Sequence, residues 1–184
     1  VKNPLRIYSG DGITLVVSEI PMPTRLVNEF GKAVVEWIQQ KNAKLVLTLG
    51  AVPVPNRINI ETPEVFAVGL GEKAGDIIKK AGVKPLEEGM MAGPYASILW
   101  QCKKRNVPIL ALLAQSFPEY PDPGAAAAVL ETLSKVIDKK IEVKDLAEKA
   151  EEIRVKTRDL MKQTGKNMQE MGKAREYEIP PLYA

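Results

Sequence analysis

Apolar, β-rich runs alternate with segments whose apolar residues recur at helical spacing, and this alternation most constrains the fold. Strands are predicted at 45–49, 65–70 and 107–114, and helices at 24–41, 72–81, 94–106 and 123–137. Because helices connect successive strands, the strands are expected to run parallel, with helices on the faces of the sheet. The sequence therefore predicts an α/β fold of three layers with a mainly parallel sheet.

Two short β-rich runs, 5–9 and 13–18, open the chain, and Gly10-Asp11-Gly12 between them is typical of a β-hairpin. The second run is apolar almost throughout, which is typical of a strand covered on both faces. Together with the helix at 24–41 and the strand at 45–49, it is predicted to form a parallel crossover unit.

The helix at 123–137 has a well-defined predicted start. Asp122 is suited to the N-cap, where a carboxylate accepts hydrogen bonds from free backbone N–H groups, and Pro123 suits the first helical turn. In the helix at 94–106, Leu99 and Cys102 are expected to point inward and Trp100 to lie at an edge.

Composition excludes several classes of function. The 184 residues include no histidine and a single cysteine, Cys102, so the usual general base, the usual metal ligands and an intrachain disulfide are absent. We therefore predict no catalytic residue, no metal and no cofactor. A formal charge of +3 without a basic stripe argues against nucleic acid, and no apolar run reaches the roughly 20 residues that span a bilayer. The lone cysteine is consistent with the cytoplasm.

An alternative function rests on the loops after the strands, where parallel α/β sheets bind ligands. The polar residues there are Asn56, Arg57, Gln115, Ser116 and Glu119. Arg57 with Glu119 could hold a polar molecule, so a small-molecule enzyme or binding protein stays open. Gly69 and Gly71 precede a helix, but Ala74 replaces the third glycine of a dinucleotide motif, which disfavours such a site.

The C-terminal part differs from the rest of the chain. We divide the sequence into an α/β domain at 1–141, a long charged helix at 142–172 and an extended tail at 173–184. The helix would be roughly 45 Å long at about 1.5 Å per residue, more than a small domain needs, which indicates a projecting arm or a subunit contact. Pro180 and Pro181 restrict the backbone and are expected to keep the tail extended.

Two segments carry a family resemblance: 89–94, Gly-Met-Met-Ala-Gly-Pro, and 118–131, which contains Tyr-Pro-Asp-Pro-Gly-Ala-Ala-Ala. With the charged helix that follows, the chain resembles the archaeal branch of the proteasome assembly chaperone 2 family over essentially its whole length. The resemblance implies a fold similar to nucleoside phosphorylases, without their activity. It also implies that a strand, a glycine-containing loop and a helix are missing from the N-terminal part of the domain at 1–141.

The last three residues, Leu182, Tyr183 and Ala184, resemble the hydrophobic–tyrosine–any-residue motif that docks proteasomal ATPases and ATP-independent activators into the α-ring of the 20S core particle. The resemblance implies that Leu182 fills an apolar recess, Tyr183 wedges against a subunit edge and the Ala184 carboxylate pairs with a lysine. Because one short tail binds weakly, several tails on a homo-oligomer are expected to act together.

The expected function is therefore that of a non-enzymatic proteasome-binding protein that opens the gate of the core particle or assists its assembly. Two alternatives stay open. One is an adapter that delivers cargo to the proteasome, and the other is the small-molecule enzyme or binding protein described above.

Overall fold

A computed structural model describes residues 3–118, 121–153 and 155–156. The chain divides into two compact units. The first comprises Val1–Thr48, Gly69–Asp76 and Leu86–Leu110, and the second comprises Leu49–Val68, Ile77–Pro85 and Ala111–Ala184.

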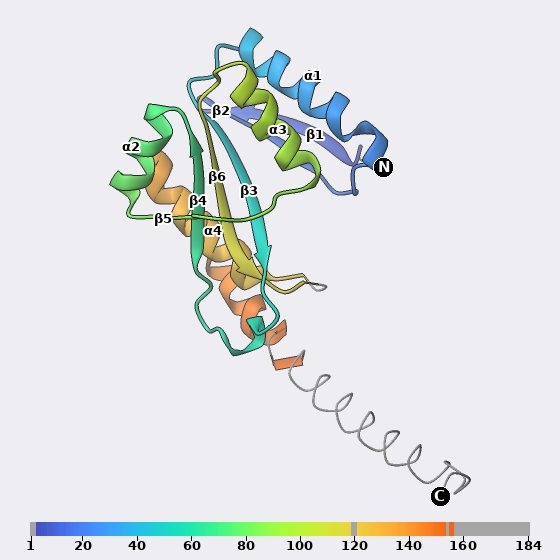
Figure 1. Cartoon of the computed structure of the whole chain (residues 1–184). Helices are drawn as coiled ribbons and strands as arrows, with labels where there is room; N and C mark the ends of the chain where they lie inside the picture. Colours follow the sequence, from blue (N-terminus) through green and yellow to red (C-terminus); the bar gives the residue numbers. More distant parts are fainter. Residues whose placement is uncertain (1–2, 119–120, 154, 157–184) are drawn as a thin grey trace, which may run out of the picture. The chain divides into compact units, whose positions relative to one another are not determined.

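The main sheet has four strands in the order β3-β6-β4-β5 (Figure 1). Their bounds are β3 Val46–Pro53, β4 Val65–Leu70, β5 Lys84–Pro85 and β6 Ile109–Ser116. The sheet is mostly parallel and flanked by helices, so the predicted fold class is confirmed. β6 lies between two other strands, and its residues are buried from Ile109 to Ala114, as expected for the central strand of a parallel sheet.

Two strands are longer than predicted. β3 continues through Gly50 to Pro53 instead of ending before the glycine. A Cβ atom at Gly50 would lie 2.9 Å from Cδ2 of Leu113 in β6, so the glycine makes room for a neighbouring side chain inside the strand. β6 continues to Ser116 instead of ending at residue 114, and the short strand β5 pairs with β4 in parallel.

The helices agree closely with the prediction. Their bounds are α1 Val27–Gln40, α2 Glu72–Ala81, α3 Gly93–Lys104 and α4 Pro123–Ile137, with 3-10 turns η1 at Thr24–Leu26 and η2 at Arg57–Asn59. Residues 144–153 are also helical and form the described start of the long helix predicted at 142–172. The remainder of that helix beyond 156 and the tail at 173–184 lie outside the described residues. None of the described helices is both long enough and apolar enough to cross a membrane.

In the first unit, α1 and α3 lie side by side (Figure 1). The two helices approach closely at Gly31 of α1, where a Cβ atom would lie 2.2 Å from Oγ of Ser97 in α3. Leu99 and Cys102 are buried and Trp100 is exposed, so all three predictions for α3 are confirmed. The glycine thus sets how closely the two helices pack.

The N-terminal hairpin is a separate two-stranded sheet formed by β1 Leu5–Gly10 and β2 Ile13–Ser18. Asp11 and Gly12 form its turn with φ values of 48° and 75°, the left-handed pair that two-residue hairpin turns require. The hairpin itself is confirmed.

Two predictions about β2 are wrong. β2 is not covered on both faces, because all of its residues after Ile13, up to Ser18, are exposed. It also does not form a crossover unit with α1 and β3, because β2 and β3 belong to different sheets. An apolar run indicates a strand that needs covering, but it does not identify the sheet in which that strand lies.

Candidate functional site

The start of α4 is organised by the side chain of Asp122. Its Oδ1 accepts a hydrogen bond from the backbone N–H of Ala125 at 2.9 Å, and its Oδ2 accepts one from the N–H of Phe117 at 3.2 Å. Pro123 takes the first helical turn. The predicted N-cap is confirmed, and the carboxylate also fixes the chain that enters the helix.

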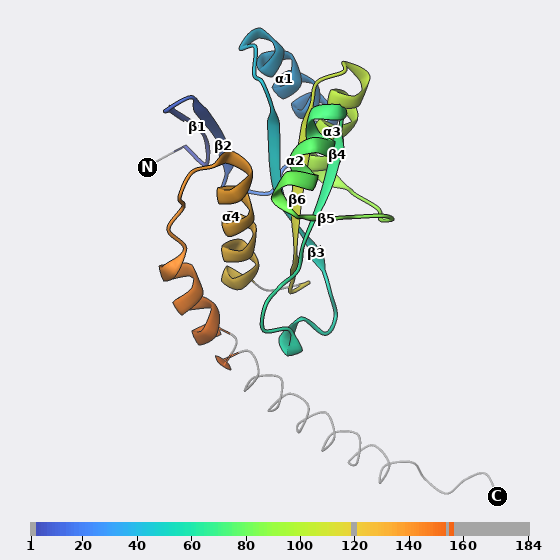
Figure 2. The same ribbon diagram turned by 90° about the vertical axis from the view of Figure 1, so that its left-hand side faces the viewer.

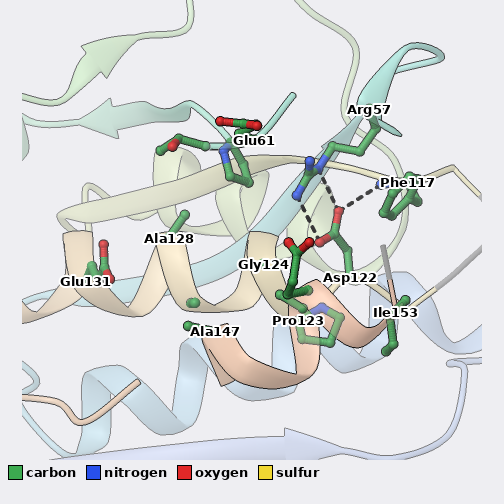
Figure 3. Close-up of a pocket in the computed structure, with 15 residues that line it drawn as sticks. Arg57, Glu61, Phe117, Asp122, Pro123, Gly124, Ala128, Glu131, Ala147 and Ile153 are labelled. Atoms are coloured by element: carbon green, nitrogen blue, oxygen red, sulfur yellow. Dashed lines mark hydrogen bonds and ion pairs between the residues drawn. The ribbon is translucent and has the colours of Figure 1, made fainter. Parts of the chain in front are cut away.

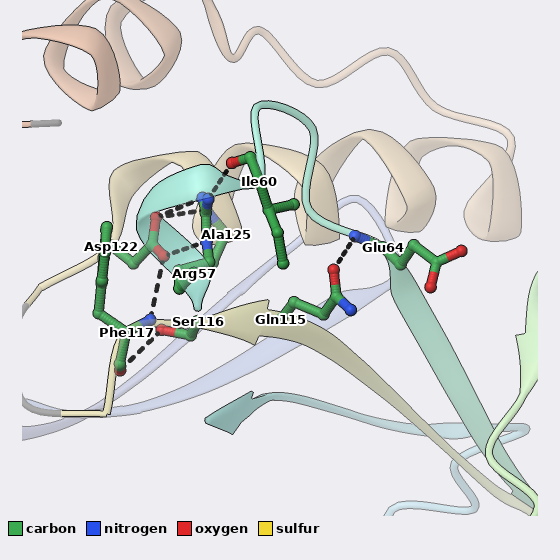
Figure 4. Close-up of polar contacts among 8 residues, drawn as sticks. All are labelled: Arg57, Ile60, Glu64, Gln115, Ser116, Phe117, Asp122 and Ala125. Atoms are coloured by element: carbon green, nitrogen blue, oxygen red, sulfur yellow. Dashed lines mark hydrogen bonds and ion pairs between the residues drawn. The ribbon is translucent and has the colours of Figure 1, made fainter. Parts of the chain in front are cut away.

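The same carboxylate binds Arg57, which lies in η2. Nε of Arg57 is 2.8 Å from Oδ2, and Nη2 donates to Oδ1 at 3.1 Å (Figure 4). Nη1 donates to the carbonyl oxygen of Ile60, and the centroid of the Phe117 ring is 5.2 Å from the guanidinium carbon. Both charged side chains are 4% exposed, so this is a buried, two-point ion pair. We call Arg57, Phe117 and Asp122 the latch.

The latch bears on the alternative that the strand-end loops bind a polar molecule. Arg57 directs its donors at Asp122 and Ile60, which leaves its charge neutralised within the protein. Gln115 accepts a hydrogen bond from the N–H of Glu64 at 3.0 Å, and Ser116 donates to the carbonyl of Phe117 at 3.3 Å (Figure 4). Glu119 lies outside the described residues. These contacts give Arg57, Gln115 and Ser116 structural roles, which weighs against a ligand site there.

A pocket of about 260 Å³ lies beside the latch (Figure 3). Three segments of the second unit line it, and the lining residues are Arg57, Glu61, Thr62, Pro63, Phe117, Asp122, Pro123, Gly124, Ala127, Ala128, Glu131, Ala147, Ala150, Glu151 and Ile153. Among them Arg57 is the one basic residue, and Asp122 neutralises it. Because phosphate and carboxylate ligands need available cationic donors, this pocket is poorly suited to a nucleotide or an organic acid.

Small residues join the pocket wall formed by α4 to the wall formed by the helical residues 144–153. A Cβ atom at Gly124 would lie 3.4 Å from Cβ of Ala150 and 3.1 Å from Nη2 of Arg57. Figure 2 shows that the chain reverses after α4, so that the next helix returns toward the N-terminal end of α4. The latch therefore lies at the base of the C-terminal helix.

The described residues offer no evident catalytic or metal-binding group. Within the ranges that the structure describes, no three or more Cys, Asp and Glu side chains are grouped so that they could hold a metal ion. Cys102 is fully buried, and this burial raises the pKa of its thiol to about 11. The thiol is thus protonated at neutral pH and is a poor nucleophile.

The predicted docking residues Leu182, Tyr183 and Ala184, together with the tail-stiffening Pro180 and Pro181, lie outside the described residues. The structure instead describes the helical residues 144–153, which precede them in the sequence.

Comparison with known proteins identifies the family. The model of the PAC2 family matches residues 1–161. The chain belongs to the PAC2 family. The resemblance to the proteasome assembly chaperone 2 family noted in the sequence is thereby confirmed.

Solved structures of PAC2-like proteins are similar to this chain. One of them is the monoclinic crystal structure of PbaA from Pyrococcus furiosus, an archaeal homologue of proteasome-assembly chaperone. Its sequence is 29% identical to this chain, the TM-score is 0.77, and the match covers 97% of this chain and 74% of that chain. PbaB of Pyrococcus furiosus, an archaeal proteasome activator, is 22% identical, with a TM-score of 0.72 over 85% of this chain and 70% of that chain. At that identity PbaB supports the fold alone.

A curated relative extends the comparison to another archaeon. An uncharacterized protein of Methanocaldococcus jannaschii is 26% identical over 180 residues, which is 98% of this chain and 71% of the relative. The PAC2 chain thus spans about seven tenths of the length of the relatives that it matches.

Proposed function

We propose that this PAC2 protein binds the 20S proteasome core particle through its C-terminal residues and catalyses no reaction of its own. Two observations support this. The family includes PbaA, a homologue of proteasome-assembly chaperone. The sequence ends in Leu182-Tyr183-Ala184, which resembles the motif that docks activators into the α-ring. The terminal motif on a chain of this family is the observation that carries the proposal.

The chemistry of the three residues fits a narrow slot between α-ring subunits. Leu182 offers an apolar side chain, and Tyr183 combines a flat ring with a hydroxyl that can find a hydrogen-bond partner at the rim. The α-carboxylate of Ala184 is a negative charge that a lysine can bind. Pro180 and Pro181 reduce the conformational entropy that the tail loses when it docks.

Several tails acting together would make a weak contact effective. A few ordered residues barely offset the entropy lost on association. Tails on one homo-oligomer raise one another's effective concentration, which adds roughly two to four orders of magnitude in affinity. We propose that the protein acts as such an oligomer, in the cytoplasm, with either gate opening or assistance to assembly as the outcome.

The first test is binding to purified archaeal 20S core particle. The full chain, Tyr183→Ala and a chain lacking residues 182–184 are compared by surface plasmon resonance with the core particle immobilised. Both variants should bind at least roughly tenfold more weakly, because the docking contact is lost. Tyr95→Ala is the matched control, since Tyr95 is an exposed tyrosine on α3, away from the tail in the sequence. Equal binding by all four proteins would refute the docking model.

Hydrolysis of a short fluorogenic peptide then separates the possible outcomes of binding. A protein that opens the gate increases the hydrolysis rate of preassembled core particle, and Tyr183→Ala removes the increase. An assembly factor instead accelerates the appearance of active particles from isolated α and β subunits. An adapter binds without changing either rate.

A further inference from the structure

Basic side chains from three segments of the chain meet at one end of the first compact unit. α1 ends just before β3, α3 ends just before β6, and α2 begins just after β4. The N–H of Val46 donates to the carbonyl oxygen of Pro108 at 3.1 Å, which places the starts of β3 and β6 side by side. Nζ of Lys73 in α2 donates to the carbonyl oxygen of Lys44 at 3.2 Å, which brings the start of α2 to the same end (Figure 1). We call the five exposed lysines at this end the lysine cluster: Lys41, Lys44, Lys73, Lys103 and Lys104.

The charges of the lysine cluster are not balanced by carboxylates. Within the part of the chain that the structure describes, no member of the cluster forms an ion pair, and Glu72 at the start of α2 is paired with none of them. Elsewhere on the surface Lys84 pairs with Glu64 at 3.3 Å. Arg105, which follows the cluster in sequence, is itself neutralised by Glu36 at 2.9 Å. The cluster is therefore a surface of net positive charge.

Helix stability explains only some of these lysines. A cation is favoured at the C-terminal end of a helix, which carries a partial negative charge, and this accounts for Lys41 after α1 and for Lys103 and Lys104 in the last turn of α3. Lys73 lies in the first turn of α2, where a cation is unfavourable, and Lys44 belongs to no helix. Like charges gathered at one end also repel one another, and a partner of opposite charge removes that repulsion.

We propose that the lysine cluster binds an acidic segment of a partner protein, through the carboxylates of glutamate and aspartate side chains. Lysine ammonium groups on flexible stems are point charges that adapt to carboxylates spaced along an extended segment. Phosphate and nucleic-acid recognition instead favours the planar fork of arginine. Arg105, the arginine beside the cluster, directs its fork at Glu36 and Gln101 at 2.9 and 2.7 Å. This interaction surface goes beyond the tail docking proposed above and does not rest on it.

The test is fluorescence anisotropy of the 184-residue chain with a short fluorescein-labelled peptide of alternating glutamate and serine, at low ionic strength. The triple variant Lys41→Gln/Lys44→Gln/Lys103→Gln removes three charges of the cluster, so its dissociation constant should rise at least roughly tenfold. The matched control carries the same change in net charge at three exposed lysines outside the cluster: Lys79→Gln/Lys80→Gln/Lys135→Gln. The control should bind within about twofold of the wild type. Equal weakening by the two triple variants, or no binding by the wild type, would overturn the proposal.

Other measurements separate peptide binding from stability and from other anionic partners. The cluster variant should melt no lower than the control variant, because removing three charges relieves repulsion. A lower melting temperature would assign the lysines to stability and count against the proposal. Tighter binding of a single-stranded oligonucleotide or of anionic phospholipid vesicles than of the peptide would also contradict it. Removal of residues 182–184 should leave peptide binding unchanged, which separates this test from that of the docking model.

Discussion

The latch offers the sharpest test of what holds the base of the C-terminal helix. Arg57→Met removes the guanidinium while keeping most of the side-chain volume, and it leaves the Asp122 carboxylate buried without its cation. Asp122→Asn keeps a side chain that can cap α4 but leaves Arg57 without a charge partner. Each variant therefore leaves one charged side chain buried without its partner, because both side chains are only 4% exposed.

The expected cost is large. Breaking a buried ion pair by removing one partner destabilises proteins by about 3–5 kcal/mol, because the remaining charge stays desolvated. In a chain of this length, 1 kcal/mol corresponds to about 2–4 °C in Tm, so each single variant should melt at least roughly 6 °C lower. The double variant Arg57→Met/Asp122→Asn removes both charges and should lose less stability than the sum of the two singles.

Thermal unfolding followed by circular dichroism, together with urea titration, gives the four free energies of this cycle. The control is Glu64→Gln, which removes the Lys84–Glu64 ion pair of 3.3 Å, whose side chains are 63% and 54% exposed. That change should cost at most about 1 kcal/mol, because exposed pairs are solvated and screened. If the single latch variants cost no more than this control, or if their effects add, the latch is not a coupled buried pair.

Two further predictions concern the first unit and the thiol. Gly31→Ala should lower the free energy of unfolding by about 1–3 kcal/mol, because its Cβ would lie 2.2 Å from Oγ of Ser97, whereas Gly75→Ala, at an open position inside α2, should raise it by about 0.5–1 kcal/mol. Urea titration of both variants checks the pair, and a shift of both in the same direction would contradict it. Burial raises the pKa of Cys102 from 9.0 to about 11, so the thiol loses its proton more easily in the unfolded state than in the native state. The free energy of unfolding should therefore fall by about 1.4 kcal/mol per pH unit as pH rises between these values. Cys102→Ala should remove this pH dependence. An unchanged pH dependence in Cys102→Ala would refute that assignment.

Local chemistry explains why much of the fold could be predicted. Asp122 and Pro123 mark the start of α4 because capping depends on residues adjacent in sequence. The hairpin turn was predictable for the same reason, since Asp11 and Gly12 tolerate positive φ. Where a local signal was ambiguous, the prediction was wrong. Gly50 is typical of a strand end in isolation, and its role as a seat for Leu113 becomes visible once β6 is its neighbour.

The candidate site was only half predictable. Asp122 was recognised as a cap, but its pairing with Arg57 spans 65 residues and follows no local spacing rule. Arg57 was instead considered as a ligand group, because an arginine in a strand-end loop has the same appearance in sequence whether its charge is free or neutralised. The apolar character of β2 was also recognised correctly, but hydrophobic periodicity did not show that β2 lies outside the main sheet.

The latch and the C-terminal helix are connected mechanically through Gly124. A Cβ atom at this position would touch both Arg57 and Ala150, so the glycine lets the guanidinium and the helix base approach α4 at the same point. A displacement of the Arg57 guanidinium therefore changes how the helical residues 144–153 pack against α4.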